Sequence, residues 1–289
     1  MWVAFAFASA FFSGLTAILA KIGIKNIDSN LATAIRTVVI LVFTWLIVII
    51  VGSQTQITNI DTKTLVFLIL SGCATGGSWL FYFKALQIAD VNKVTPLDKS
   101  SVLLTMILGI TVLGENINLA IILGLIGIAI GTYLMVKSNK TNQTPQQTAQ
   151  NKKWIIYAIL SAVFASLTAI LGKVGIQNIE SNLGTAIRTV VVCLLAWAIV
   201  FMTGKIKGIT TIKRKSLVFL ILSGFTTGLA WLSYYHALQT GPASIIVPID
   251  KLSIVLTVIF AYIVLNEKLT KTSLIGLILI VIGTLALLL

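Results

Sequence analysis

The stretch KIGIKNIDSNLATAIRTVV, residues 21–39, returns almost unchanged as KVGIQNIESNLGTAIRTVV at residues 173–191. The second copy follows the first at an offset of 152 residues, the difference between 173 and 21. Further along the chain, LVFLILSG at Leu65 and Leu217 keeps this offset, and so do Asp98 and Asp250. An offset shared over so much of the chain indicates that one structural unit occurs twice.

The composition places both units in a lipid bilayer. Apolar residues make up 57% of the 289 residues, charged residues make up only 10%, and the mean hydropathy is +1.03. Apolar runs of about 20 residues, the length that crosses a bilayer as a helix, recur ten times. The predicted spans are residues 2–25, 30–51, 64–87, 92–113 and 117–136 in the first unit, and 154–177, 182–203, 216–239, 244–265 and 270–288 in the second.

Five is an odd number of spans, so the second unit enters the membrane from the opposite side. Two similar units of this kind are related by a pseudo-twofold axis in the membrane plane. The sequence therefore predicts an all-α membrane protein with ten transmembrane helices in two inverted five-helix repeats. The first repeat is expected over residues 1–137 and the second over 154–289, with the polar stretch SNKTNQTPQQTAQNKK, residues 138–153, as a flexible linker.

The last predicted helix of each repeat, with the loop before it, resembles a known family. The two segments are ENINLAIILGLIGIAIG from Glu115 and EKLTKTSLIGLILIVIG from Glu267, each with a loop glutamate before a glycine-bearing helix. With these motifs the chain resembles an EamA-type member of the drug/metabolite transporter superfamily over nearly its whole length. The resemblance implies a ten-helix secondary transporter of small metabolites, amino acids or drugs.

Lysine and arginine outside the spans indicate the orientation. Thirteen of these fourteen residues fall on the side of the linker, and Lys63 alone falls on the other side. The positive-inside rule then predicts a multi-pass protein of the cell (plasma or inner) membrane with a cytoplasmic linker and both termini outside. The resemblance would place both termini inside, and we follow the charge count. The net charge of +13 is explained by this topology, so nucleic acid is not an expected partner.

The segments TPLDKSSVLLT, residues 95–105, and VPIDKLSIVLT, residues 247–257, place Asp98 and Asp250 inside predicted helices. A charged side chain that faces lipid costs at least about 2.5 kcal/mol, so these carboxylates are expected to face one another or a water-filled cavity. Neighbouring positions on a helix point about 100° apart, which makes the following Lys99 a poor partner of Asp98. The expected partners of Asp98 are Arg36, Lys21 or Lys84.

Each repeat is expected to carry one polar layer, and inversion places the two layers on opposite sides of the midplane. The first layer contains Lys21, Arg36, Lys84 and Asp98, and the second contains Lys173, Arg188, His236 and Asp250.

A polar stripe continues from each aspartate at helical spacing. The positions three and seven residues further on are Ser101 and Thr105 in the first repeat, and Ser253 and Thr257 in the second. Pro96 and Pro248 leave two alternatives, because the proline either interrupts a helix or stands in its first turn.

The third span of each repeat carries an aromatic pair, Trp79 with Tyr82 and Trp231 with Tyr234. Such rings could wall a substrate pocket or hold a cation against a ring face. Packing between helices explains them equally well, and the sequence leaves both interpretations open.

The charge inside the spans suggests the substrate. The predicted helices contain seven basic residues against two aspartates. Cations without compensation in a low-dielectric site favour an anionic ligand. We therefore expect a transporter of a small anionic or zwitterionic metabolite, with Arg36 and Arg188 contacting its acid group. Asp98 and Asp250 either hold these arginines in place or take up a proton.

Three other interpretations remain open from the sequence. In the first, the substrate is cationic or a quaternary ammonium compound, held by the Trp and Tyr faces and an aspartate. In the second, the charges form a buried ion pair that fixes helix register. In the third, the protein is a membrane receptor or scaffold without transport. One histidine and two cysteines at non-equivalent positions supply no catalytic set and no metal site, so neither an enzyme nor a cofactor is expected. The oligomeric state is left open.

Overall fold

The computed structural model describes residues 1–25, 27–89, 91–137, 153–265 and 269–288, and every regular element among them is helical. The first repeat contains α1 (Trp2–Gly23), α2 (Ser29–Val51), η1 (Ser53–Asn59), α3 (Thr62–Ile88), α4 (Val91–Lys99), α5 (Ser101–Leu113) and α6 (Leu119–Lys137). The second contains α8 (Lys153–Gly175), α9 (Ser181–Met202), η2 (Lys205–Thr211), α10 (Arg214–Thr240), α11 (Ala243–Lys251), α12 (Ser253–Leu265) and α13 (Lys271–Ala286). Both η1 and η2 are short 3₁₀ helices.

The predicted all-α membrane fold is confirmed. Within the described residues, nine segments are long and apolar enough to cross a bilayer. The tenth predicted span corresponds to α13, a shorter apolar helix of 16 residues.

The fourth predicted span of each repeat consists of two helices. Ser100 separates α4 from α5, and Leu252 separates α11 from α12. Pro96 and Pro248 lie inside α4 and α11, so the alternative in which proline interrupts the span is the correct one. A proline ring removes a backbone donor and crowds the preceding turn, which weakens the helix nearby. In each span the break therefore falls two residues after an aspartate.

Two acidic residues of the repeated stretch explain where α2 and α9 begin. The Asp28 carboxylate accepts a hydrogen bond from the backbone N–H of Asn30 at 3.0 Å, and the Glu180 carboxylate accepts one from the backbone N–H of Asn182 at 3.0 Å. Such N-caps satisfy donors that have no partner in the first helical turn. The caps set where each helix starts, and with it the depth of the arginine two turns later.

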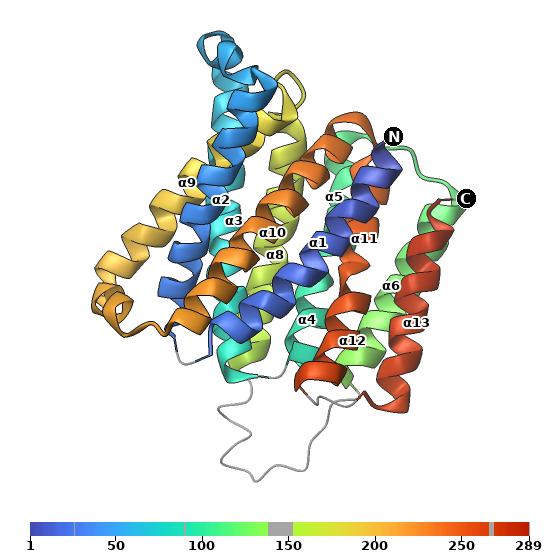
Figure 1. The fold of residues 1–289 in the computed structure, drawn as a ribbon. Helices are drawn as coiled ribbons and strands as arrows, with labels where there is room; N and C mark the ends of the chain where they lie inside the picture. Colours follow the sequence, from blue (N-terminus) through green and yellow to red (C-terminus); the bar gives the residue numbers. More distant parts are fainter. Residues whose placement is uncertain (26, 90, 138–152, 266–268, 289) are drawn as a thin grey trace.

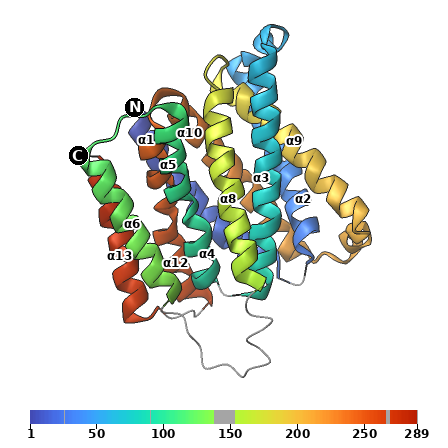
Figure 2. The same ribbon diagram turned by 180° about the vertical axis from the view of Figure 1, so that it is seen from behind.

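The two repeats interlock. Helix α1 lies along α10, and α8 lies along α3, so the first helix of each repeat packs on the third span of the other (Figures 1 and 2). Helix α1 also contacts α11 and α12, and α8 also contacts α4 and α5. Other close pairs include α2 with α9 and α6 with α13, and α2 and α9 also contact α10 and α3 of the other repeat. A site in the middle of the molecule is therefore built by both repeats.

Both termini lie at one end of the molecule, whereas α6 ends and α8 begins at the opposite end (Figure 1). This is the arrangement that an odd number of crossings in each repeat produces.

Candidate functional site

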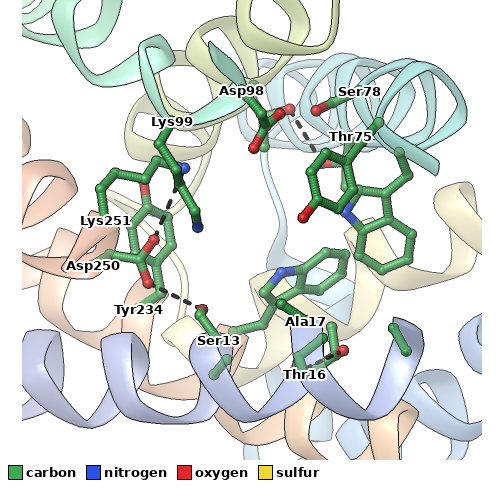
Figure 3. Close-up of a pocket in the computed structure, with 18 of the residues that line it drawn as sticks. Ser13, Thr16, Ala17, Thr75, Ser78, Asp98, Lys99, Tyr234, Asp250 and Lys251 are labelled. Atoms are coloured by element: carbon green, nitrogen blue, oxygen red, sulfur yellow. Dashed lines mark hydrogen bonds and ion pairs between the residues drawn. The ribbon is translucent and has the colours of Figure 1, made fainter. Parts of the chain in front are cut away.

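A central cavity of about 190 Å³ lies between the repeats. Its wall is formed by α1, α2, α3 and α4 from the first repeat and by α8, α10, α11 and α12 from the second. Figure 3 shows the charged ends of Asp98, Lys99, Asp250 and Lys251 directed toward this space, with Ser13 of α1 next to Asp250. The fold thus brings the two aspartate segments, 152 residues apart in the chain, to one site.

Most of the predicted site residues lie in this wall. The eight that do are Arg36, Trp79, Tyr82, Asp98, Trp231, Tyr234, Asp250 and Thr257. The other four predicted residues are buried but lie outside the described wall: Arg188, Ser101, Thr105 and Ser253.

The predicted polar stripe crosses the break between the two helices of each span. The Thr105 hydroxyl donates to the backbone carbonyl of Ser101 at 2.9 Å, and the Thr257 hydroxyl donates to that of Ser253 at 3.0 Å. These bonds satisfy the threonines within their own helices.

Each aspartate is held by the first helix of the other repeat. The Asp98 carboxylate accepts a hydrogen bond from the Ser161 hydroxyl of α8 at 2.6 Å. The Asp250 carboxylate accepts from the Ser9 hydroxyl of α1 at 2.5 Å and from Ser13 at 3.3 Å. Ser9 and Ser161 are themselves separated by the repeat offset. The two bonds are therefore equivalent under the pseudo-twofold axis.

The predicted ion pair of Asp98 with Arg36, Lys21 or Lys84 is wrong. Arg36 donates to the hydroxyl of Thr227 at 2.9 Å, and Lys21 donates to the carbonyl of Leu86 at 3.2 Å. The ammonium of Lys84 lies 4.9 Å from the centroid of the Tyr157 ring. Depth in the helix is similar for these residues, but the interlocked packing points them to different neighbours.

The two cavity lysines have different partners. The ammonium of Lys99 donates to the Ser253 hydroxyl of the other repeat at 2.9 Å. The Lys251 ammonium lies 4.0 Å from a carboxylate oxygen of Asp250.

The two arginines lie against aromatic rings. The Arg36 guanidinium carbon is 4.9 Å from the Phe83 ring centroid and 5.5 Å from that of Trp79. The Arg188 guanidinium carbon is 4.0 Å from the Tyr235 centroid and 5.5 Å from the Trp231 centroid. Arginine above an aromatic face is a favourable arrangement, more so when both groups are desolvated.

Glycines let the arginine-bearing helices approach closely. A Cβ atom at Gly72 of α3 would lie 3.1 Å from the Arg188 carbonyl oxygen, and one at Gly224 of α10 would lie 3.0 Å from that of Arg36. Small residues at such contacts bring the backbones of membrane helices together.

Trp79 and Trp231 meet at the cavity. Their ring centroids are 5.0 Å apart with an angle of 36° between the planes. Both rings also line the cavity. Of the two interpretations left open by the sequence, each therefore describes part of the arrangement, since the rings pack on one another and wall the pocket.

The serines and threonines of the wall were not among the residues predicted from the sequence. These include Ser9, Ser13 and Thr16 on α1, Thr75 and Ser78 on α3, and Thr168 on α8. A signal was present, because Ser9 and Ser161, like Thr16 and Thr168, keep the repeat offset. A single hydroxyl in an apolar helix commonly bonds to the backbone of its own helix, so it does not indicate a site unless its partner is known.

The charge at the site is smaller than the predicted spans indicated. Among the described wall residues, Arg36, Lys99 and Lys251 are basic, and Asp98 and Asp250 are acidic. Of the seven basic residues counted in the spans, four lie elsewhere: Lys21, Lys84, Lys173 and Arg188. The expected pair of separate polar layers is replaced by one mixed cluster with a formal surplus of one positive charge.

Two interlocked helical repeats thus enclose a polar cavity within a bilayer-spanning fold, an architecture that recurs among membrane transporters. The chain matches the EamA-like transporter family over residues 1–137 and 152–289, so it belongs to that family. Members of the family are transporters and not enzymes, in agreement with the sequence analysis.

Related proteins are found at the length of one repeat. An "Uncharacterized transporter in cobO 3'region" of Sinorhizobium sp. is 46% identical over 134 residues, which is 46% of this chain and 95% of that protein. "Uncharacterized protein MJ1333.1" of Methanocaldococcus jannaschii is 31% identical over 129 residues, covering 45% of this chain and 91% of that protein. A solved structure titled "Crystal structure of protein" covers 99% of this chain with a TM-score of 0.74 at 16% identity, which is a likeness of fold.

Proposed function

We propose that this protein is a secondary transporter that carries a small anionic or zwitterionic metabolite by alternating access around the central cavity. The observation that carries this proposal is the charge of the described wall, where three basic residues face two acidic ones. In a low-dielectric site an excess positive charge is costly without a counter-charge. A substrate acid group would supply that counter-charge.

The aspartates are proposed to couple transport to protons. Asp98 and Asp250 stand in the wall beside Lys99 and Lys251, and each is held by serine hydroxyls of α8 or α1. Ionisable residues inside membrane helices commonly mark proton relays and substrate paths. Because the two carboxylates occupy equivalent places in inverted repeats, each is positioned to serve one of the two states of an alternating-access cycle.

The proposed organisation follows the matched segments. A first repeat at residues 1–137 and a second at 154–289 are joined by a linker at 138–153, which we place in the cytoplasm on the charge count. Both termini then lie outside. Labelling of a cysteine placed at either terminus with a membrane-impermeant maleimide, in intact cells, tests this orientation.

A cationic or quaternary-ammonium substrate is the second candidate, favoured by Trp79 and Trp231 in a wall with two carboxylates. Against it, the Arg36 and Arg188 guanidinium carbons already lie 5.5 Å from the centroids of these two rings. A further cation would have to share or displace these contacts. The anionic or zwitterionic substrate is therefore the better fit.

Thermal unfolding of the purified protein in detergent separates the candidates, because a bound ligand stabilises the folded state by mass action. Acids are expected to raise the melting temperature, and choline is expected to leave it unchanged. The opposite result would establish the cationic candidate. Uptake into proteoliposomes then distinguishes a transporter from a receptor or scaffold. The paired variant Asp98→Asn with Asp250→Asn should abolish proton-driven uptake, and full retention would refute the coupling role.

A further inference from the structure

The two arginines of the repeated stretch occupy equivalent positions in the fold. Arg36 and Arg188 are separated by the repeat offset, and each reaches from the second helix of its own repeat to the third span of the other. The hydroxyl groups available to them are equivalent too: Ser71 and Thr75 on α3, and Ser223 and Thr227 on α10. Symmetry alone would give both arginines the same bonds.

Arg188 is engaged by the helix that it meets. Its Nε donates to the Ser71 hydroxyl at 2.9 Å, and its Nη2 donates to the Thr75 hydroxyl at 2.8 Å. The Ser71 hydroxyl in turn donates to the carbonyl of Thr168 at 2.8 Å, which fixes its orientation. The Arg188 side chain is fully buried and lies outside the described cavity wall. Its Nη1 is buried without a hydrogen bond to any described residue, but its two other nitrogens tie α9 to α3.

Arg36 is held by a single bond. Its Nη2 donates to the Thr227 hydroxyl at 2.9 Å, whereas its Nε and Nη1 are buried and make no hydrogen bond to any residue that the structure describes. The hydroxyl of Ser223, the counterpart of Ser71, is likewise without a bond among the described residues. Phe83 replaces Tyr235, and its ring lies at 4.9 Å instead of 4.0 Å.

Arg36, unlike Arg188, belongs to the described cavity wall. Arg36 is only 1% exposed, yet it forms part of the cavity wall. A buried guanidinium nitrogen without an acceptor is costly, and a charge-assisted bond to a carboxylate is among the strongest ways to satisfy it. A ligand acid group in the cavity would supply that acceptor.

We propose that Arg36 contacts the acid group of the substrate, whereas Arg188 is a positioning residue that braces α9 against α3. This inference rests on the proposed function and narrows it, because the repeat pattern assigned both arginines the same role. It makes the binding site asymmetric, with the acid group of the substrate on the α2 side.

The test compares Arg36→Lys with Arg188→Lys in the full-length protein, using acetate, succinate and L-glutamate as probes. Arg214→Lys, an exposed arginine at the start of α10, is the control. In Arg36→Lys the melting temperature without ligand should be unchanged and the rise caused by an acid should be lost. In Arg188→Lys the melting temperature without ligand should fall and the rise caused by the acid should remain.

Uptake into proteoliposomes gives a second readout for the stabilising acid. Because lysine cannot reproduce the planar fork of arginine, KM should rise at least about tenfold in Arg36→Lys and stay within about threefold in Arg188→Lys. Loss of the acid response in Arg188→Lys with unchanged stability would overturn the assignment, and so would equal effects of the two variants. Stabilisation of the wild type by none of the acids would overturn the proposed function and, with it, the substrate role of Arg36.

Two serine variants keep the test decisive if Arg188→Lys does not fold. Ser71→Ala removes the Nε partner of Arg188 and should lower the melting temperature without ligand. Ser223→Ala removes a hydroxyl that has no bond within the described chain and should leave it unchanged. Equal stability of the two serine variants would refute the bracing role.

Discussion

Glu115 holds the start of α11 from the other repeat. One of its carboxylate oxygens accepts a hydrogen bond from the backbone N–H of Ala243 at 2.7 Å, and the other accepts one from that of Ser244 at 2.8 Å. The Lys173 ammonium donates to the carbonyl oxygens of Leu238 and Gly241 at the end of α10. The connection between α10 and α11 is thus fixed from both sides.

Glu115→Ala should loosen this connection. The substitution leaves two N–H groups of the first turn of α11 without their acceptor. Loss of an N-terminal cap costs about 0.5–2 kcal/mol, and bonds to charged groups are at the strong end of the scale, so the expected cost is about 2 kcal/mol. This free energy corresponds to a change of about 30-fold in the equilibrium between the connection in its observed position and the connection detached from residue 115. Glu115→Gln keeps one acceptor oxygen and should change the equilibrium by about fivefold.

Cysteine labelling measures this change. The background carries Cys73→Ser and Cys193→Ser, and the reporter is Ser13→Cys in the cavity wall. A membrane-impermeant maleimide is added from the side that bears both termini, and the labelling rate is followed in proteoliposomes. The rate should increase in the order wild type, Glu115→Gln, Glu115→Ala. Equal rates in all three proteins would show that Glu115 does not restrict access from this side.

Three other substitutions test the packing and the site. Gly131→Ala should destabilise the contact of α6 with α13 by about 1–3 kcal/mol, because its Cβ would lie 2.5 Å from a backbone oxygen; the exposed Ile130→Ala is the control, and equal melting temperatures would refute this packing. Ser9→Ala removes a bond of 2.5 Å to Asp250 and should slow uptake by about tenfold without unfolding the protein; unchanged uptake would exclude a role for that bond. Trp79→Ala opens the cavity wall and should raise KM more than it lowers the maximal rate, as steady-state uptake will measure.

Much of the architecture could be predicted because it depends on regularities of the chain itself. The offset that relates residues 21–39 to 173–191 indicates two copies, and spans of bilayer length in an odd number indicate inversion. Asp98 and Asp250 stand out because a charge within an apolar helix needs a partner or a cavity. These inferences need only composition, length and periodicity.

The partners of the charged residues were decided by the tertiary structure alone. Ser161 holds Asp98 because α8 packs against α4, and no pattern in the sequence specifies that two helices of different repeats meet there. Lys99 meets Ser253 because α4 packs against α12 of the other repeat. Arg36 and Arg188 stand in nearly identical stretches, yet one lines the cavity and the other braces two helices. A local sequence fixes the direction of a side chain on its own helix, whereas its partner depends on which helix packs opposite it.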